Sequence, residues 1–171
     1  QVQSLTTGPS ASKRKVIWEF DGKGRRIRQR TYDQSSGGDV LTVDLKLLGD
    51  AWRHIAELNA GDNSLIRFYV WGLDLGGSLD GAGGIGGLLL TKSTANGPHF
   101  FAYDGNGNVS ALVSATNGAQ SAVYEYDPFG GTLRANGFMA HENRFQFSTK
   151  RADKTTDLES YEYRIRRVDS C

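Results

Sequence analysis

The chain has 171 residues, with 20 basic and 19 acidic side chains, so its formal net charge is +1. This length predicts one domain that can bury a core, and the balanced charge argues against a nucleic-acid or membrane-surface partner. No stretch approaches the run of about 18 apolar residues that a membrane helix needs. The chain begins with Gln1 and its only cysteine is Cys171, so we expect a processed or excised piece without an internal disulfide.

Short alternating segments dominate the chain. Residues 1–12 lack a regular pattern and are expected to form a flexible lead, whereas strands are predicted from residue 13 onward. Glycine is abundant, with 22 residues against three prolines, and it separates aromatic and β-branched runs, which is typical of short strands joined by tight turns. The apolar faces are predicted to hold Val16, Trp18 and Phe20; Ile27, Gln29 and Thr31; Val43, Leu45 and Leu47; and Ala122, Tyr124 and Tyr126.

Two segments allow alternatives at this level. The basic run 25–30 is expected to be a solvated strand face, with an anionic partner as the alternative. Residues 50–60 carry the best helix signal, with Asp50 as a cap and Gly61 as a stop. A strand over residues 52–58 competes with that helix.

An internal repeat organises the middle of the chain. Each copy has an aromatic or apolar residue, then Asp, two variable residues and Gly. The Asp side chain accepts hydrogen bonds from backbone further along the turn, and the Gly supplies a positive φ. The residue before Asp is expected to pack on its counterpart in the next repeat. The four copies are Phe20, Asp21 and Gly24; Leu73, Asp74 and Gly77; Tyr103, Asp104 and Gly107; and Tyr126, Asp127 and Gly130.

A weaker fifth copy lies at residues 48–52, between the first two. Successive copies start 28, 25, 30 and 23 residues apart, counted from Phe20, Leu48, Leu73, Tyr103 and Tyr126. A unit of this size is one hairpin, which cannot bury its apolar face alone. We therefore expect neighbouring hairpins to stack into one sheet.

A glycine-rich stretch, LDGAGGIGGLLL at residues 79–90, has the G-x-G-x-x-G spacing of a dinucleotide-binding loop. Such a site needs a helix after the last glycine, and no useful helix fits before Pro98. We therefore expect no cofactor, positive φ at glycines of 81–87, and no helix after Gly86. Leu79 is expected in a preceding strand, with a strand resuming at Leu88.

Two of the repeats carry a family resemblance. YDGNGNVSAL at 103–112 and YEYDPFGGTL at 124–133 resemble the YD repeat of bacterial Rhs proteins, and related shells occur in Tc-toxin C subunits and teneurins. The likeness covers roughly residues 13–166, and RFQFSTK at 144–150 resembles the start of the motif that closes the Rhs repeat-associated core. Relatives have a repeat turn followed by a strand where this chain has residues 50–58, which favours strand there.

The resemblance implies an all-β fold of consecutive antiparallel YD-repeat hairpins, forming an open, twisted spiral sheet that is part of a β-shell. The flexible lead (1–12) would precede the repeat sheet (13–150) and a degenerate core end (151–171), whose last residues are expected to be disordered. In this end Tyr161 and Tyr163 keep the register of the family, but glycine and other tyrosines are replaced by Asp157, Glu159, Ser160 and Glu162. The self-cleaving aspartyl site and variable toxin region of the family have no counterpart in this sequence.

No catalytic, cofactor or metal site is predicted. Residues 104–108 imitate the start of a calcium loop, but Val109 and Ala115 replace the required Gly and Glu. Asn108 begins a formal glycosylation sequon. The three histidines lack metal-ligand spacing and are expected to be structural or surface residues: His54, His99 and His141. Trp18 and Trp71, like the repeat tyrosines, are expected to be core residues; the alternative is that they form a platform on which a sugar stacks.

We therefore expect a non-enzymatic scaffold fragment of a secreted or surface bacterial protein. Unpaired strand edges should recruit further copies into an oligomer or filament, with the remaining shell or a toxin cargo as other partners. A glycan-binding recognition module and a remnant of a polymorphic toxin are the alternatives.

Overall fold

The computed structural model describes residues 2–5, 14–155, 159–162 and 167–170, and the positions of Cys171 and most of the lead segment fall outside them. The described chain is all-β, as the sequence predicts. An eleven-stranded antiparallel meander is followed by a short helical turn, η1, and a three-stranded sheet. The strands of the large sheet are β1 (Val2–Leu5), β2 (Arg14–Phe20), β3 (Arg26–Asp33), β4 (Val40–Asp50), β5 (Arg53–Asn59), β6 (Leu65–Trp71), β7 (Leu88–Ser93), β8 (Gly97–Tyr103), β9 (Val109–Ser114), β10 (Gln120–Tyr126) and β11 (Thr132–Asn136). The remaining elements are η1 (Phe147–Thr149), β12 (Ala152–Asp153), β13 (Glu159–Glu162) and β14 (Arg167–Ser170).

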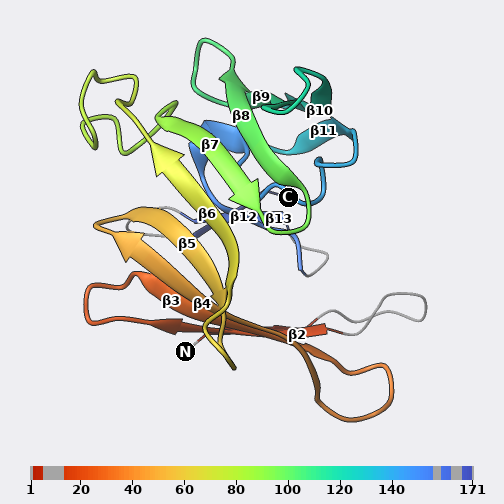
Figure 1. Ribbon diagram of the computed structural model, residues 1–171. Helices are drawn as coiled ribbons and strands as arrows, with labels where there is room; N and C mark the ends of the chain where they lie inside the picture. The colour runs from red at the N-terminus through yellow and green to blue at the C-terminus, as the bar shows by residue number, and fades with distance from the viewer. Residues whose placement is uncertain (1, 6–13, 156–158, 163–166, 171) are drawn as a thin grey trace.

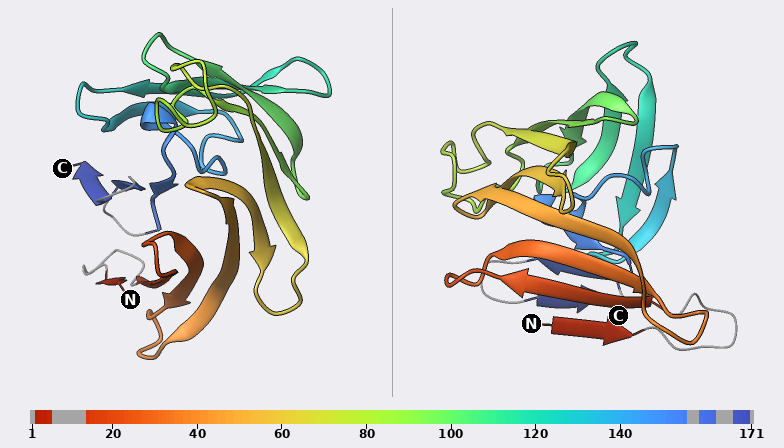
Figure 2. Two further views of the ribbon diagram at one scale, coloured as in Figure 1. Left: turned by 90° about the vertical axis from the view of Figure 1, so that its left-hand side faces the viewer. Right: turned by 60° about the horizontal axis from the view of Figure 1, so that its bottom comes forward.

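Every strand of the large sheet pairs with its neighbours in sequence, so the hairpins stack in chain order (Figure 1). The sheet twists and curls without closing, and the chain after β11 returns along its hollow side (Figure 2). The open spiral sheet that the family resemblance implies is therefore confirmed. Asp50 to Asn59 form a hairpin end and β5, so strand is the correct assignment for that segment.

Two local expectations are wrong. Residues 2–5, which belong to the expected flexible lead, form β1 and pair with residues 15–18 of β2. Leu79 lies in a turn region and not in a strand, because no strand separates β6 from β7. Turns built around Asp74 occupy that interval instead.

The hollow side of the sheet holds the core. Trp18, Leu88 and Leu112 are fully buried there, and one cluster joins Leu112 and Tyr124 to Met139 from the returning chain. A second cluster packs the ring of Phe145 against Tyr69 and Leu88. The core is thus completed by residues that follow the sheet in sequence.

A β-bulge reverses the predicted faces in β3. The register between β2 and β3 shifts at Phe20, where Phe20 pairs with Arg26 after Glu19 has paired with Arg28. As a result Arg26 is buried and Ile27 is 41% exposed, the opposite of the expectation for the basic run. Beyond the bulge the expectation holds: Gln29 and Thr31 are buried.

Candidate functional site

The four repeat turns share one hydrogen-bond pattern. In each, the Asp N–H donates to the carbonyl four residues later at 2.7–3.0 Å, and the Gly N–H donates to the Asp carbonyl at 2.9–3.1 Å. One carboxylate oxygen also accepts the N–H groups two and four residues later, at 2.8–3.4 Å. The turn glycines have φ of +76°, +72°, +75° and +92° in chain order. The turns are formed by Asp21 and Gly24; Asp74 and Gly77; Asp104 and Gly107; and Asp127 and Gly130.

The fifth copy differs from these turns. Asp50 pairs with Arg53 across a tight connection, its carboxylate accepts from Arg53 Nη2 at 2.6 Å, and Ala51 has φ of +52°. Residues 48–52 therefore join β4 to β5 as a hairpin without the Asp–Gly turn.

The residue before the Asp is partly buried in two of the repeats and exposed in the other two. Tyr103 and Tyr126 are partly buried, and each stacks on the ring two residues earlier, Phe101 or Tyr124. The Tyr103 hydroxyl donates to the Leu88 carbonyl, and the Tyr126 hydroxyl donates to the Val109 carbonyl at 2.9 Å. Phe20 and Leu73 are 38% and 63% exposed, so packing between repeats is not the rule at this position. The bulge at Phe20 and the end of β6 at Trp71 remove these two residues from the alternation.

Replacing Asp127 with Ala removes the acceptor for the N–H groups of Phe129 and Gly131. We expect urea denaturation to show a loss of about 1–2 kcal/mol in the free energy of unfolding, because two turn amides lose their partner. Asp127→Asn keeps an acceptor and should lose clearly less. Equal losses in the two variants would contradict a role for these hydrogen bonds.

The returning chain, residues 139–155, is called the inner segment here. It lies against the hollow side of the sheet and bonds to the turns (Figure 2). Thr149 Oγ1 donates to the Gly107 carbonyl at 2.7 Å and accepts from the Gly86 N–H at 2.8 Å. Lys150 Nζ donates to the Gly83 carbonyl at 2.6 Å. The RFQFSTK stretch therefore links the glycine-rich loop to the third repeat turn.

Asn108 also connects the third repeat turn to the inner segment. Its side chain is buried: Nδ2 donates to Asp104 Oδ2 at 2.7 Å, and Oδ1 accepts from the Ser148 N–H at 2.8 Å. Glycosylation needs an accessible Nδ2, so the folded structure does not support Asn108 as a glycosylation site. The side chain has a structural role instead.

Asp74 organises the glycine-rich loop. Its second carboxylate oxygen accepts the N–H groups of Ala82 at 2.6 Å and Gly84 at 3.1 Å. Burial would raise the pKa of Asp74, but these backbone donors outweigh burial and lower it below its usual value. Gly83, Gly84 and Gly86 have φ of +68°, +79° and +74°. A strand, and no helix, follows Gly86, so the loop lacks the βα geometry of a dinucleotide site.

A charge network lies beneath β3, β5 and β6. Glu57 is 1% exposed, and its Oε1 lies 3.3 Å from Arg151 Nη2 and accepts from the Tyr69 hydroxyl at 3.0 Å. Arg151 Nη1 also donates to Gln29 Oε1 at 3.2 Å. Burial alone would raise the pKa of Glu57, but Arg151, Arg144 and Arg67 together lower it to about 2.

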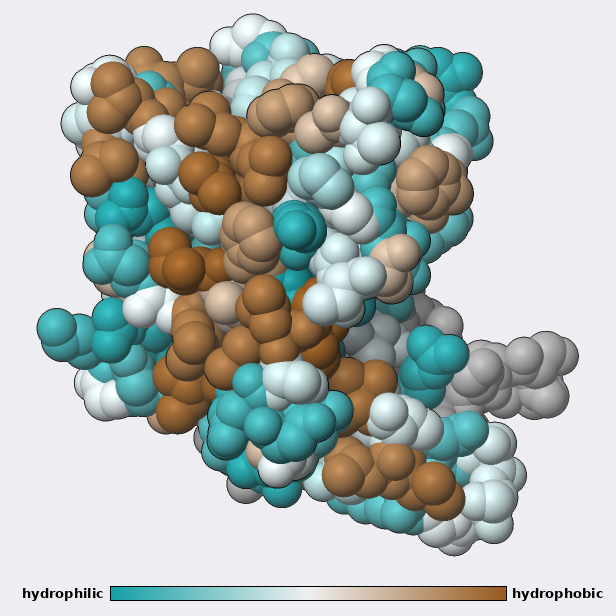
Figure 3. Space-filling model, in the orientation of Figure 1, coloured by the Kyte–Doolittle hydropathy of each residue, from teal (hydrophilic) through white to brown (hydrophobic). Residues whose placement is uncertain are grey.

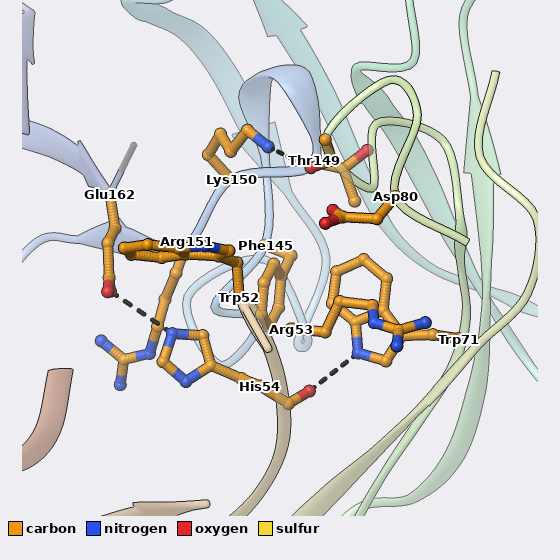
Figure 4. A pocket seen from close by; sticks show the side chains of 11 residues that line it. Trp52, Arg53, His54, Trp71, Asp80, Phe145, Thr149, Lys150, Arg151 and Glu162 are labelled. Atoms are coloured by element: carbon orange, nitrogen blue, oxygen red, sulfur yellow. Dashed lines mark hydrogen bonds and ion pairs between the residues drawn. The ribbon is translucent and has the colours of Figure 1, made fainter. Parts of the chain in front are cut away.

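A second group of charges anchors β12 and β13. Arg26 lies 3.5 Å from both Asp153 and Glu162, and its guanidinium is 5.0 Å from the ring centroid of Trp18. His54 Nε2 is 3.4 Å from Glu162 Oε2 (Figure 4). Burial would raise the pKa of Glu162, but His54 and Arg26 lower it to about 2. Trp18 Nε1 completes the anchor by donating to Asp153 Oδ2 at 3.0 Å.

Beside these charges lies a small cavity (Figure 4). Its volume of about 40 Å³ is room for a few water molecules at most and far below the roughly 300–1,000 Å³ of ligand pockets. Trp71 Nε1 donates to the His54 carbonyl at 2.7 Å, and Phe145 packs edge-on against Trp71. Within the described ranges, no three His, Cys, Asp or Glu side chains gather as metal ligands. This geometry joins chain segments and leaves little room for a substrate.

Sequence reasoning did not identify this network as a site. One feature of the sequence could have indicated it. Arg67 and Tyr69 are two residues apart in a strand, so their side chains lie on the same face, which is the inner face of β6. His99 is buried, whereas His54 contacts Glu162 and His141 is exposed. The structure thus keeps the three histidines in separate places.

The charge network predicts that the free energy of unfolding falls at acidic pH. The folded pKa of Glu57 is about 2, below the unfolded value of about 4.3, so its ionisation stabilises the fold above that unfolded value. That stability is lost as pH falls from about 4.5 to about 2. Tryptophan fluorescence during urea unfolding at pH 6 to pH 2 should show this decline. A Glu57→Gln variant should have a shallower pH dependence, and an unchanged slope would contradict the assignment.

Comparison with known proteins agrees with this architecture. No family model matches the chain. The tRNA3(Ser)-specific nuclease WapA of Bacillus spizizenii is 26% identical over 144 residues, which is 84% of this chain and 5% of that protein. The crystal structure of TcdB2-TccC3 superposes with a TM-score of 0.58 at 17% identity, covering 96% of this chain and 8% of that chain. A Photorhabdus luminescens Tc holotoxin pore gives 0.54 at 14% identity, covering 95% and 8%.

These similarities define the fold. The chain spans less than a tenth of the length of the relatives that it matches. The described residues include no helix long and apolar enough to cross a membrane. The Tc-toxin likeness supports, at the level of fold, the resemblance to Rhs-type shells that the repeat motifs carry.

Proposed function

We propose that this chain is a non-enzymatic structural segment of a YD-repeat, Rhs-like β-shell in a secreted or surface protein of bacteria. One observation carries the proposal: the inner segment and the following strand β13 tie successive repeat turns to one another. Thr149 bonds to the third turn at Gly107, and the Tyr161 hydroxyl donates to the fourth turn at Gly130 at 3.1 Å. Such links fix the curvature of a wall. The TM-score of 0.58 to a Tc-toxin complex over 96% of the chain supports the same role.

The proposed wall associates with further protein at its edges. β1 and β11 end the large sheet, and neither has a second strand neighbour among the described residues. Open edges of this kind pair with other chains. The face seen in Figure 3 also carries an apolar band across β4 to β8, formed by Leu48, Ile55, Val70, Leu89 and Phe100, each 37–50% exposed. Exposed apolar bands are common at protein–protein contacts, and this band supports the proposed association.

Light scattering over a range of protein concentrations, followed by electron microscopy of negatively stained samples, tests the assembly. We expect dimers or filaments whose population grows with concentration. Leu133→Lys places a charge on the β11 edge at a 70% exposed position and should reduce assembly. Phe129→Ser, in a turn at 87% exposure, serves as the control. A wild-type chain that stays monomeric at the highest concentration would overturn this part of the proposal.

The similarity to WapA favours one second candidate, a segment belonging to a nuclease toxin. In that case the catalytic residues lie elsewhere in the larger protein, because the chain matches only 5% of that relative. Incubation of the purified chain with transfer RNA should therefore leave the RNA intact. Cleavage that persists through repurification and disappears in Glu57→Gln or His54→Ala would replace the structural proposal.

A further inference from the structure

We propose that the apolar band on the outer face of the sheet is the contact surface for a second copy of this chain, packed face to face across a two-fold axis. The band crosses the face of the molecule shown in Figure 3 and comprises Leu48, Ile55, Val70, Leu89 and Phe100. The inference rests on the structural role proposed above and specifies the partner. It places association on a face of the sheet, in addition to the open edges.

The band is continuous across β4 to β8, because cross-strand neighbours connect its members. The register gives two rows that meet on β6: Leu48, Ala56 and Phe68 on β4 to β6, and Val70, Leu90 and Phe100 on β6 to β8. Directly paired residues of an antiparallel sheet point to the same face. The two rows therefore form one apolar surface that runs across the strands.

The two faces of the sheet are reversed in polarity at this level. An antiparallel sheet with one solvated face normally turns its apolar side chains to the core and its polar side chains to water. Here β6 turns Arg67 and Tyr69 inward, whereas Phe68 and Val70 alternate with them and point outward. The hollow side of β5 to β8 carries polar side chains that are only 1–3% exposed: Glu57, Tyr69, Thr91 and His99. This reversal favours a protein contact on the outer face over a solvated face.

The size of the band matches what a dimer needs. Its five side chains are 37–50% exposed, which leaves about 400 Å² of apolar surface on one copy, at roughly 150–200 Å² for each large side chain. Two copies would then bury about 800 Å² of apolar surface, and the whole contact would cover about 1,400 Å², since apolar atoms form about 57% of an interface. Stable complexes bury about 1,200–2,000 Å².

The charge of the chain and the composition of the band both suit a second copy. The formal net charge is +1, so two copies repel each other only weakly. A two-fold contact sets the same surface of each copy against the other, and an apolar surface is complementary to itself. Lys92 pairs with Phe68 and Pro98 in the register and borders the band. Its ammonium group would lie in the solvated rim of the contact.

Sedimentation velocity over a range of protein concentrations tests the contact with a matched pair of variants. Val70→Lys puts a like charge into the band of both copies, whereas Val40→Lys makes the same change at a 53% exposed position where β4 begins, outside the band. We expect a wild-type dimer whose dissociation constant rises at least about tenfold in Val70→Lys and changes less than about twofold in Val40→Lys. If circular dichroism shows that Val70→Lys does not fold, Phe100→Thr decides, because threonine suits a strand.

Chemical cross-linking locates the contact. In a Cys171→Ser background, a short bismaleimide should link two copies through Val70→Cys or Phe100→Cys, because packed sheet faces lie about 10 Å apart. A dimer that Leu133→Lys disrupts and Val70→Lys leaves intact would overturn this contact and leave the edge association of the proposed function standing. Dimers lost only in the band variants would support the contact and remove the edges from the proposal. A wild-type chain that stays monomeric at the highest concentration would overturn both forms of association, while the transfer-RNA assay still tests the non-enzymatic role.

Discussion

We expect Glu57→Gln to lower the free energy of unfolding by about 3–5 kcal/mol, because it leaves buried guanidinium groups without their carboxylate. Glu57 is 1% exposed and bonds to Arg151 and Tyr69. Gln preserves the side-chain size, so the loss reports charge and hydrogen bonding and not a cavity. Chemical denaturation monitored by tryptophan fluorescence measures the change. Hydrogen exchange should show the first loss of protection in the inner segment.

An exposed ion pair provides the control for this experiment. Glu125 and Arg134 are both about half exposed, and Glu125→Gln should change stability by about 0–1 kcal/mol. A second test removes both charges: Glu57→Gln combined with Arg151→Met should recover part of the loss, since the uncompensated charge is then absent. A double variant that is clearly less stable than Glu57→Gln alone would contradict this interpretation, because removing Arg151 would then cost stability even after its carboxylate partner is gone.

Gly107→Ala is the second change with a large expected effect, a loss of about 2–4 kcal/mol. Gly107 has φ of +75°, where a Cβ costs about 1–2 kcal/mol. The added Cβ would also overlap the Ile85 side chain and approach Leu75 Cδ1 at 3.1 Å and the Gly86 N at 3.2 Å. Overpacking of this kind typically costs about 1–3 kcal/mol. Thermal and urea unfolding should show the loss.

The first repeat turn offers a matched comparison. Gly24 has φ of +76°, but a Cβ there would meet nothing within 4 Å. Gly24→Ala should therefore lose only the conformational part, about 1–2 kcal/mol. The difference between the two variants isolates the contact of the third turn with the glycine-rich loop. Equal losses would mean that this contact does not stabilise the fold.

Together, the two experiments separate two ways in which the fold of the sheet is stabilised. The turn glycines set the local path of each hairpin, and the charge network joins strands that are far apart in the chain. Glu57 and Arg151 are 94 residues apart, and Trp18 and Asp153 are 135 apart. The curled sheet needs both, because the hairpins alone do not fix how strongly the sheet curls.

The sequence by itself determined the all-β class, most of the strands and the four repeat turns. Asp and Gly at this spacing form the same turn in all four repeats, because the Asp side chain bonds backbone within four residues and Gly adopts positive φ. Both effects are local, so the sequence is sufficient to predict them. The same holds for Leu45 and Leu47, whose alternation with charged neighbours correctly predicted burial.

The tertiary structure alone decided the rest. Arg26 became buried and Ile27 exposed because a bulge shifts the register, and a one-residue shift exchanges the two faces of a strand. The partners of Glu57 and the role of Asn108 depend on where the inner segment lies against the sheet. That placement comes from contacts between distant residues, and a period of two along each strand carries no information about them.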